Sequence, residues 1–577
     1  MAPEFVVVGN GTLALGCCCL LAERGLRLRA VVSEDEALGQ WARRAGVPHL
    51  VAPAELATLA WAGPAPVLLS IGNERLIAPR VLERFPRAFN FHDGPLPHYA
   101  GSHVTSWALM ARERTYAITW HRMTSRADAG DILLQAQVPL GPDDTALTLN
   151  AKCHEVALQS FAALAQRLAR HDFSGTPQNM ARRTFYRRDR RADNAAILDW
   201  KRDADDLRAM VRALSFGPYV NRLGLPKLWL GSGYAGVHGL DVCASRSVSV
   251  PGTLVGIAPD SLTVATASHD VRLRGFVTLD GRALSASELA GLFALREEDV
   301  LPAHEPKHAR AATDEACDWK EEAAWIEHLK ALKPVAAPLP APGICGTAAG
   351  LRVVLHAPPR HRLGSAFGTA DDFAFAVVLA YLARAQAVQE FDVGLRCGHR
   401  GSAAGGRDDA LLAGTRPLRI SLDFDQPFEA FGRRCLAGLA AWRSRKPYLR
   451  DAVLRYPGVA RPRGWDDFCS WPVTIDLGGA ASGLGAYSQA WEIRSGMTFA
   501  IGTAAGSVTL IHGGLPPRQL DRLSAQLSAL AEDCLARPHL ALGKLALLPP
   551  ADGEALLREM RGVWVEAPAA RQRENGR

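Results

Sequence analysis

Several features of secreted, membrane and nucleic-acid-binding proteins are missing from this sequence. Its eleven cysteines are odd in number and form no C-x-x-C pair, which argues against a disulfide framework or a structural zinc site. The apolar N-terminal stretch, residues 5–21, is broken by glycines and has neither a basic start nor a small-residue cleavage site. A net charge of +7 over 577 residues is too small to make nucleic acid or a membrane the expected partner. These absences predict a cytoplasmic protein.

The composition that remains is that of an ordinary globular protein, with 48% hydrophobic and 22% charged residues. At about 150 residues per domain, the length suggests three or four domains. No cluster of Cys, His, Asp or Glu has the spacing of metal ligands, so no metal is expected. The chemistry must then come from ordinary side chains.

The first domain is expected at residues 1–185 and belongs to the α/β class. Short buried strands alternate with helices, which predicts a Rossmann-like parallel sheet. The predicted strands are residues 4–8, 26–33, 67–71, 87–91 and 117–122. The predicted helices are residues 12–25, 78–85, 102–112 and 146–170.

Three further regions follow. Residues 171–195, called the connecting segment below, carry six arginines between Arg182 and Arg191 and are interpreted as a solvated surface linker. Short runs near 242–248, 252–257, 261–266 and 271–278 predict a small β-barrel domain at 196–305. A helix and a Pro/Ala-rich linker are expected at 306–342, and an α+β domain at 343–565.

Two motifs could carry chemistry. The turn at Gly9, Gly11 and Ala14 follows a strand and opens a helix, as in the dinucleotide fingerprint, with Glu34 or Asp35 near the end of the second strand. It indicates either NAD binding or a tight turn that needs glycine for its backbone alone. A non-catalytic NAD-binding or docking module is therefore one alternative for the whole chain.

The second motif is more specific. Asn90 and His92 end a predicted strand, and Asp128 lies in a turn after the strand predicted at 117–122. An amide, an imidazole and a carboxylate at adjacent strand ends suit acyl transfer. The amide can stabilise an oxyanion, the imidazole can move a proton, and the carboxylate can orient the imidazole.

The pattern N-x-H-x-x-x-L-P followed by D-x-G-D resembles the 10-formyltetrahydrofolate-dependent formyltransferases. The resemblance covers about residues 1–300 and implies Asn90, His92 and Asp128 as catalytic residues, 10-formyltetrahydrofolate as co-substrate, and an OB-like second domain. It also implies a substrate contact at Ser102. The residues implied in folate binding are Arg75, Leu76, Ile77, Thr124, Ser125, Arg126, Ala127 and Asp128.

Within that family, runs such as HDGPLPHYAG and ALTLNAKCHEVALQSF are most similar to the formylation domain that opens some nonribosomal peptide synthetases. The last 240 or so residues resemble the C-terminal lobe of a condensation domain without its H-H-x-x-x-D motif, which implies a silent docking or spacer lobe. The expected reaction is formylation of an aminoacyl group on a peptidyl carrier protein, with carrier and adenylation domains as partners in trans. An aminosugar, a hydroxylamine or methionyl-tRNA are the alternative acceptors.

Overall fold

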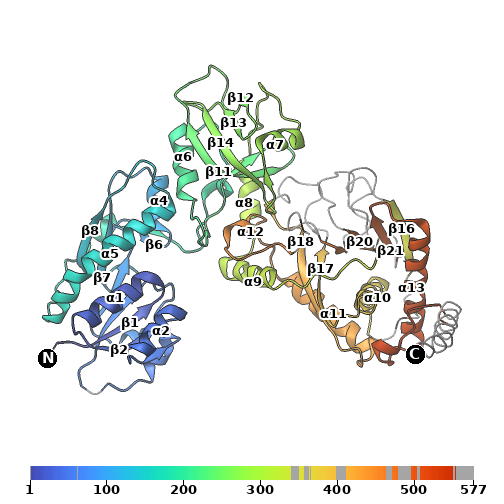
Figure 1. The fold of residues 1–577 in the computed structure, drawn as a ribbon, viewed down its shortest axis with the longest axis horizontal. Coiled ribbons are helices and arrows are strands. Elements are labelled where there is room, and N and C mark those ends of the chain that lie inside the picture. The colour runs from blue at the N-terminus through green and yellow to red at the C-terminus, as the bar shows by residue number, and fades with distance from the viewer. Residues whose placement is uncertain are drawn as a thin grey trace, which may run out of the picture. The chain divides into compact units, whose positions relative to one another are not determined.

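The computed structural model describes residues 2–61, 63–339, 350–356, 361, 363, 366–397, 411–462, 465, 471–477, 496–502, 507–549 and 553. The chain divides into two compact units (Figure 1). Unit 1 comprises residues 1–231, 236–276 and 284–304, and unit 2 comprises residues 232–235, 277–283 and 305–577. Each unit is described by itself.

A seven-stranded sheet of order β3-β2-β1-β4-β5-β7-β8 forms the centre of the first domain. The strands are β1 (Phe5–Gly9), β2 (Leu28–Val32), β3 (His49–Leu50), β4 (Val67–Ile71), β5 (Ala88–His92), β7 (Tyr116–Arg122) and β8 (Ile132–Val138). The helices are α1 (Gly11–Glu23), α2 (Glu36–Arg44), α3 (Pro79–Leu82), α4 (Val104–Met110) and α5 (Ala146–Ala169). The prediction of an α/β domain is confirmed.

Alternation along the central strands explains how both faces of this sheet are covered. Val6 and Val8 on β1 belong to a buried cluster with Val81 and Phe85, which lie on and just after α3. Because side chains alternate along a strand, Val7 points to the opposite face, where α1 packs against β1. A strand buried on both faces has to be apolar throughout, as the run FVVVG is.

The sheet is mixed, and the prediction of a parallel sheet is wrong at one edge. β1 to β5 pair in parallel, whereas β7 is antiparallel to both β5 and β8. β7 begins near the end of β5 that carries His92 and ends beside Phe89, since His92 pairs with Thr119 and Phe89 pairs with Arg122.

The rest of unit 1 follows the connecting segment. Its sheet has the order β10-β11-β14-β13-β12, with β15 pairing with β14. The elements are α6 (Ala204–Ala213), β10 (Lys227–Trp229), β11 (Tyr234–Val242), β12 (Leu254–Ile257), β13 (Ser261–Val264), β14 (Val271–Thr278), β15 (Ala283–Leu284) and α7 (Ala286–Phe293). An OB-like barrel remains a prediction.

The strand expected near 242–248 lies earlier in the chain, at β11. Residues 243–248 form a loop instead, because the Asp270 carboxylate accepts hydrogen bonds from the Ser247 amide and hydroxyl.

Unit 2 contains a six-stranded mixed sheet of order β16-β21-β20-β19-β17-β18. Its strands are β16 (Gly350–His356), β17 (Glu390–Arg396), β18 (Thr415–Ser421), β19 (Val473–Asp476), β20 (Met497–Ile501) and β21 (Ser507–His512). Its longer helices are α10 (Ala370–Ala385), α11 (Phe428–Ser444) and α13 (Pro517–Ala536). Every residue from Phe373 to Ala383 is buried, because α10 contacts the sheet and both neighbouring helices. The condensation-like identity of this lobe remains a prediction.

Part of the linker expected at 306–342 is folded. Residues 306–330 form α8 (Pro306–Glu315) and α9 (Trp319–Lys330), and the short helix α12 (Ala452–Arg455) lies much later in unit 2. Trp325, Ile326 and Leu329 are buried on one face of α9, which packs against α12. The helix expected in the charged part of this segment is therefore present, as two helices of which α9 is amphipathic. Residues 340–349, with the end of the Pro/Ala-rich run, lie outside the described residues.

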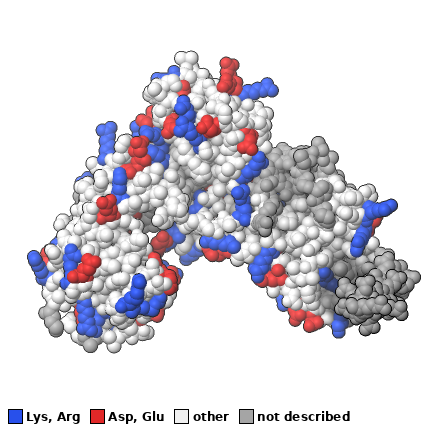
Figure 2. Space-filling model, in the orientation of Figure 1, with Lys and Arg blue, Asp and Glu red and all other residues white. Residues whose placement is uncertain are grey.

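Charges of both signs are interspersed on the face drawn in Figure 2, where no single basic patch forms. Within the described ranges, no helix has the length and hydropathy needed to cross a membrane.

Candidate active site

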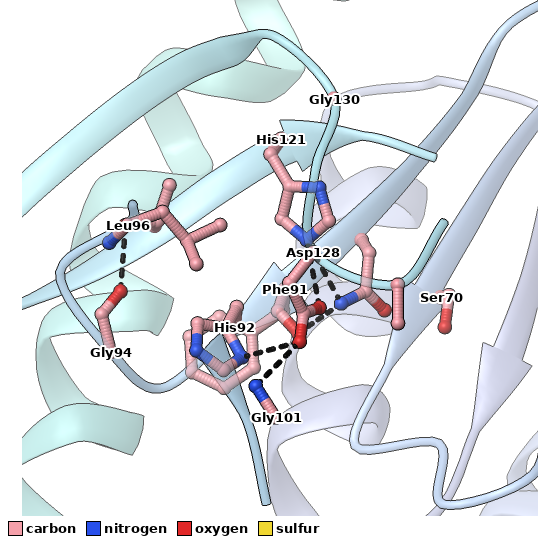
Figure 3. Close-up of polar contacts among 12 residues, drawn as sticks. Ser70, Phe91, His92, Gly94, Leu96, Gly101, His121, Asp128 and Gly130 are labelled. Atoms are coloured by element: carbon pink, nitrogen blue, oxygen red, sulfur yellow. Dashed lines mark hydrogen bonds and ion pairs between the residues drawn. The ribbon is translucent and has the colours of Figure 1, made fainter. Parts of the chain in front are cut away.

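Three neighbouring strands position the predicted catalytic residues. Asn90 and His92 lie in the second half of β5, two residues apart and on the same face of the sheet. Asp128 lies in the loop between β7 and β8. In the sheet register, Asn90 is paired with Ser70 on β4 and with His121 on β7. β7 ends beside Phe89, and the loop that follows it folds back along the sheet and places Asp128 next to His92. The structure thus brings all three predicted residues together, with His92 next to Asp128 (Figure 3) and Asn90 linked to Asp128 through His121.

The Asp128 carboxylate is the centre of the cluster. Its Oδ2 accepts a hydrogen bond from the Gly101 amide at 2.9 Å and lies 3.9 Å from His92 Nδ1, and its Oδ1 lies 3.5 Å from His121 Nε2 (Figure 3). Burial opposes its ionisation, but His92, His121 and the Gly101 amide outweigh burial and hold the pKa of Asp128 well below its usual range. Asp128 is therefore a negative charge at all physiological pH values.

The His92 ring is oriented by the main chain. His92 is 4% exposed, and its Nε2 lies 2.7 Å from the carbonyl oxygen of Tyr99. A carbonyl can only accept, so Nε2 carries a proton and Nδ1 is left facing Asp128 at 3.9 Å and Asp93 at 3.8 Å. We expected Asp128 to orient His92, but 3.9 Å is too long for a hydrogen bond, and Tyr99 has that role.

His121 is a site residue that neither sequence motif includes. It is 2% exposed, and its Nδ1 lies 2.9 Å from the Arg122 carbonyl oxygen. Its Nε2 lies between the Asn90 amide nitrogen at 3.3 Å and Asp128. Without a proton Nε2 can accept from Asn90, and with one it can donate to Asp128. The available signal was its position on the strand that leads into the Asp128 turn.

Asn90 connects the cluster to the surface. Its amide nitrogen donates to the Phe91 carbonyl at 2.8 Å, and the residue is half-buried while Phe89 and Phe91 beside it are buried. A ligand can therefore reach the amide, whereas His92 and His121 lie behind it. This is the arrangement expected of an oxyanion donor in front of a buried proton-transfer group.

The first predicted folate-binding loop follows β4 and has mixed surroundings. Arg75 forms an ion pair with Glu34 at 2.6 Å, and the Leu76 side chain is 92% exposed. Ile77 is 9% exposed and packs in the core cluster with Val81, so its side chain is committed to that core. Leu76 is the member of this loop that can offer apolar surface to a ligand.

The second predicted folate-binding run leads into Asp128. Thr124, Ser125, Arg126 and Ala127 are exposed, and the Thr124 hydroxyl donates to the Arg126 carbonyl at 2.8 Å. These side chains border the cluster without joining its hydrogen bonds among the described residues.

Ser102, the predicted substrate contact, directly follows the two-residue strand β6 (Ala100–Gly101). β6 pairs with β9 (Phe185–Tyr186), and the Ser102 amide donates to the Tyr186 carbonyl at 2.9 Å. Its main chain is thus held in place. The residue as a whole is half-buried.

The glycine turn after β1 has structural causes that need no dinucleotide. A Cβ on Gly9 would lie 1.8 Å from the Ile71 carbonyl oxygen, and Gly11 has a φ of +77°. Both candidate acids also have partners, since Glu34 pairs with Arg75 and Asp35 accepts from the Gly11 amide. Among the described residues, no group of three His, Cys, Asp or Glu could hold a metal ion.

Comparison with known proteins supports this site. Residues 48–164 match the model of a protein family described as formyl transferase. The matched segment contains Asn90, His92 and Asp128 together with His121. The similarity to formyl transferases thus covers residues 48–164, which include the cluster around Asp128.

Solved structures give more distant similarities. The N-formyltransferase from Helicobacter canadensis, solved with folinic acid and dTDP-3-aminofucose, is 15% identical over 47% of this chain and 99% of its own, with a TM-score of 0.38. HypX from Aquifex aeolicus, solved with tetrahydrofolic acid, is 15% identical over 57% of this chain and 58% of its own, with a TM-score of 0.37. A sugar N-formyltransferase from Shewanella sp FDAARGOS_354 is 14% identical over 39% of this chain and 92% of its own, with a TM-score of 0.32.

Proposed function

We propose that this protein transfers a formyl group from 10-formyltetrahydrofolate to a primary amine. The observation that carries the proposal is the convergence of Asn90, His92 and Asp128 at the strand ends of a segment similar to formyl transferases. In this reaction the amine nitrogen forms a bond to the formyl carbon, and the bond from that carbon to N10 of the folate breaks. The amine loses one proton and N10 gains one.

The chain's own groups suit these requirements. The half-buried Asn90 amide stabilises the charge that develops on the formyl oxygen. The Nε2 proton of His92 is bonded to Tyr99, so proton transfer through His92 uses Nδ1. Asp128, with its lowered pKa, is a poor base at neutral pH and serves as a fixed negative charge that stabilises the cationic form of a neighbouring imidazole. Exposed Leu76 offers apolar surface beside this edge, as a flat folate ring requires.

The acceptor in this proposal is an aminoacyl group on a peptidyl carrier protein. The carrier and an adenylation domain act as partners, and unit 2 serves as a docking lobe without chemistry of its own. The resemblance of residues 89–101 and of the C-terminal region to peptide-synthetase domains motivates this choice. A tether places the amine at the site and reduces the entropic cost of bringing two substrates together.

The first test is calorimetric titration with 5-formyltetrahydrofolate, with NAD as a parallel ligand. Saturable folate binding and no heat with NAD are expected, and the reverse result would overturn the proposal. The second test offers the protein 10-formyltetrahydrofolate together with an aminoacyl carrier protein, a nucleotide-linked aminosugar, hydroxylamine or methionyl-tRNA. Formylation of the carrier-bound amine alone is expected. Formylation of a different acceptor would keep the reaction and replace the substrate.

A further inference from the structure

The connecting segment, predicted to be a surface linker, contacts three loops at the edge of the site. Arg188 forms an ion pair at 2.6 Å with Glu74, in the loop that follows β4. The Thr184 hydroxyl accepts from the Tyr99 amide at 2.7 Å. Gln178 binds the loop that carries Asp128. These contacts join elements that are far apart in the sequence.

The loop that carries Asp128 needs such support. Asp128 has a φ of +51°, in the left-handed region that costs a residue with a Cβ about 1–2 kcal/mol. Gln178 Nε2 donates to the carbonyl oxygens of Asp128 at 3.1 Å and of Gly130 at 2.7 Å. The two bonds hold the main chain on either side of Ala129. The carboxylate then lies where the Gly101 amide can bind it.

The Gln178 side chain makes these bonds at a cost. The residues from Ser174 to Thr176, as well as Pro177, Asn179 and Met180, are exposed, whereas Gln178 is half-buried. Its Oε1 is buried without a hydrogen-bond partner in the described structure. An unpaired buried oxygen costs about 1–3 kcal/mol, so the two donated bonds have to outweigh this cost.

We propose that Gln178 is a positioning residue for formyl transfer, which sets the Asp128 carboxylate against Gly101 and the two histidines by holding its loop. This inference rests on the proposed function. Arg183 adds a second contact, since its guanidinium donates to the Ala127 carbonyl at 2.9 Å. Gln178 differs from it by binding the carbonyls of Asp128 itself and of Gly130.

The test replaces Gln178 with methionine, which has a similar shape and no donor. The matched control is Gln159→Met, because Gln159 is an exposed residue of α5 whose amide pairs only with Glu155 among the described contacts. Hydrogen exchange of the Gly101 amide reports the position of Asp128 without any need for activity. We expect exchange at Gly101 to become about 10-fold faster in Gln178→Met and to stay unchanged in Gln159→Met.

Kinetics supply the second measurement. A displacement of about 1 Å at a reacting group costs about 100-fold in rate, so kcat should fall between 10-fold and 100-fold while the melting temperature stays close to that of Gln159→Met. Unchanged Gly101 exchange and kcat would overturn the proposal. So would a parallel loss of thermal stability, kcat and folate binding, since that pattern describes a purely structural residue. Faster Gly101 exchange in a protein whose wild type transfers no formyl group would support the positioning of Asp128 and refute the proposed function.

Discussion

Two buried polar clusters, one in each unit, both place a carboxylate beside basic side chains, but with different geometry. In unit 2, Arg455 pairs with Glu322 and with Asp451, each at 2.9 Å, and all three side chains are at most 1% exposed. In unit 1, Asp128 lies 3.5 Å and 3.9 Å from the two histidines, next to the half-buried Asn90. The unit 2 cluster is satisfied internally. The unit 1 cluster keeps hydrogen-bonding capacity for a ligand.

The comparison separates structural from chemical use of buried charge. A closed ion cluster such as that of Arg455 contributes to stability only while all its partners are present. Long contacts around Asp128 stabilise less, but they allow protons and ligands to move. Mutations in the two clusters should therefore affect different measurements.

The largest effect is expected for Glu322→Ala. The substitution leaves Arg455 buried with one carboxylate partner removed, and breaking such a pair costs about 3–5 kcal/mol. Denaturant unfolding should show this loss, while folate binding by unit 1 persists below the transition. Glu327→Ala on the same helix is the control, since Glu327 is exposed. A stable Glu322→Ala protein would contradict the structural interpretation of the cluster.

Asn90→Ala should show the opposite pattern. Loss of one oxyanion donor typically lowers kcat by about 10²–10³, which corresponds to about 2.7–4 kcal/mol in the transition state. The half-buried side chain should contribute little to the free energy of unfolding. Single-turnover formyl transfer and a thermal melt measure the two quantities. Turnover close to that of the wild type would show that Asn90 is not the oxyanion donor.

Each unit contains a buried aspartate with a lowered pKa, so the two units can also be compared through the pH dependence of their stability. Burial opposes ionisation of Asp392, but bonds from His328, Arg419 and the Lys333 amide lower its pKa, as His92 and His121 lower that of Asp128. The stabilisation from each is present above the ordinary aspartate pKa of about 3.9 and is lost as the pH falls through the lowered native value.

Asp392→Asn should therefore lower the free energy of unfolding by about 1.5–3 kcal/mol at pH 7, and the difference from the wild type should narrow below about pH 4. Asp128→Asn should also lower the free energy of unfolding at pH 7, with a difference from the wild type that narrows at low pH. Formyl transfer should fall only in Asp128→Asn. Equal losses of activity in both variants would contradict the assignment of Asp128 to catalysis and of Asp392 to stability alone.

The smallest effect is expected at an exposed pair. Lys330 and Glu327 are 2.8 Å apart on α9, closer than Arg455 and Glu322, but their side chains are 34% and 70% exposed. Exposed pairs contribute about 0–1 kcal/mol, so Lys330→Ala should change the unfolding midpoint very little. A loss as large as that of Glu322→Ala would show that distance alone decides the effect.

Much of the local structure could be predicted from the sequence. Predicted residues 67–71 are strand β4, and predicted helix 146–170 is α5, Ala146–Ala169. The side chains of Thr145 and Thr148 cap the start of α5 through local hydrogen bonds. Asn90 and His92 could be singled out because both lie in one short motif on one strand.

Other parts of the site depend on contacts between distant residues. The importance of His121 follows from its register against Asn90, which requires β7 to be antiparallel to β5. Gln178 lies 50 residues from Asp128 in the sequence, in a segment whose arginines suggested a surface linker. Neither periodicity nor spacing indicates such contacts, because both report only on near neighbours along the chain.

The sequence by itself determined the apolar strands, the amphipathic helices and the polar residues placed at strand ends, since local periodicity and short-range hydrogen bonds decide these features. Only the tertiary structure decided that the Asp128 loop returns over His92, that Tyr99 orients that imidazole, and that Gln178 holds the loop. The physical reason is that these contacts join segments far apart in the sequence, as Asn90 pairs with His121 across two strands and Gln178 binds the loop of Asp128, and no local pattern encodes such pairings.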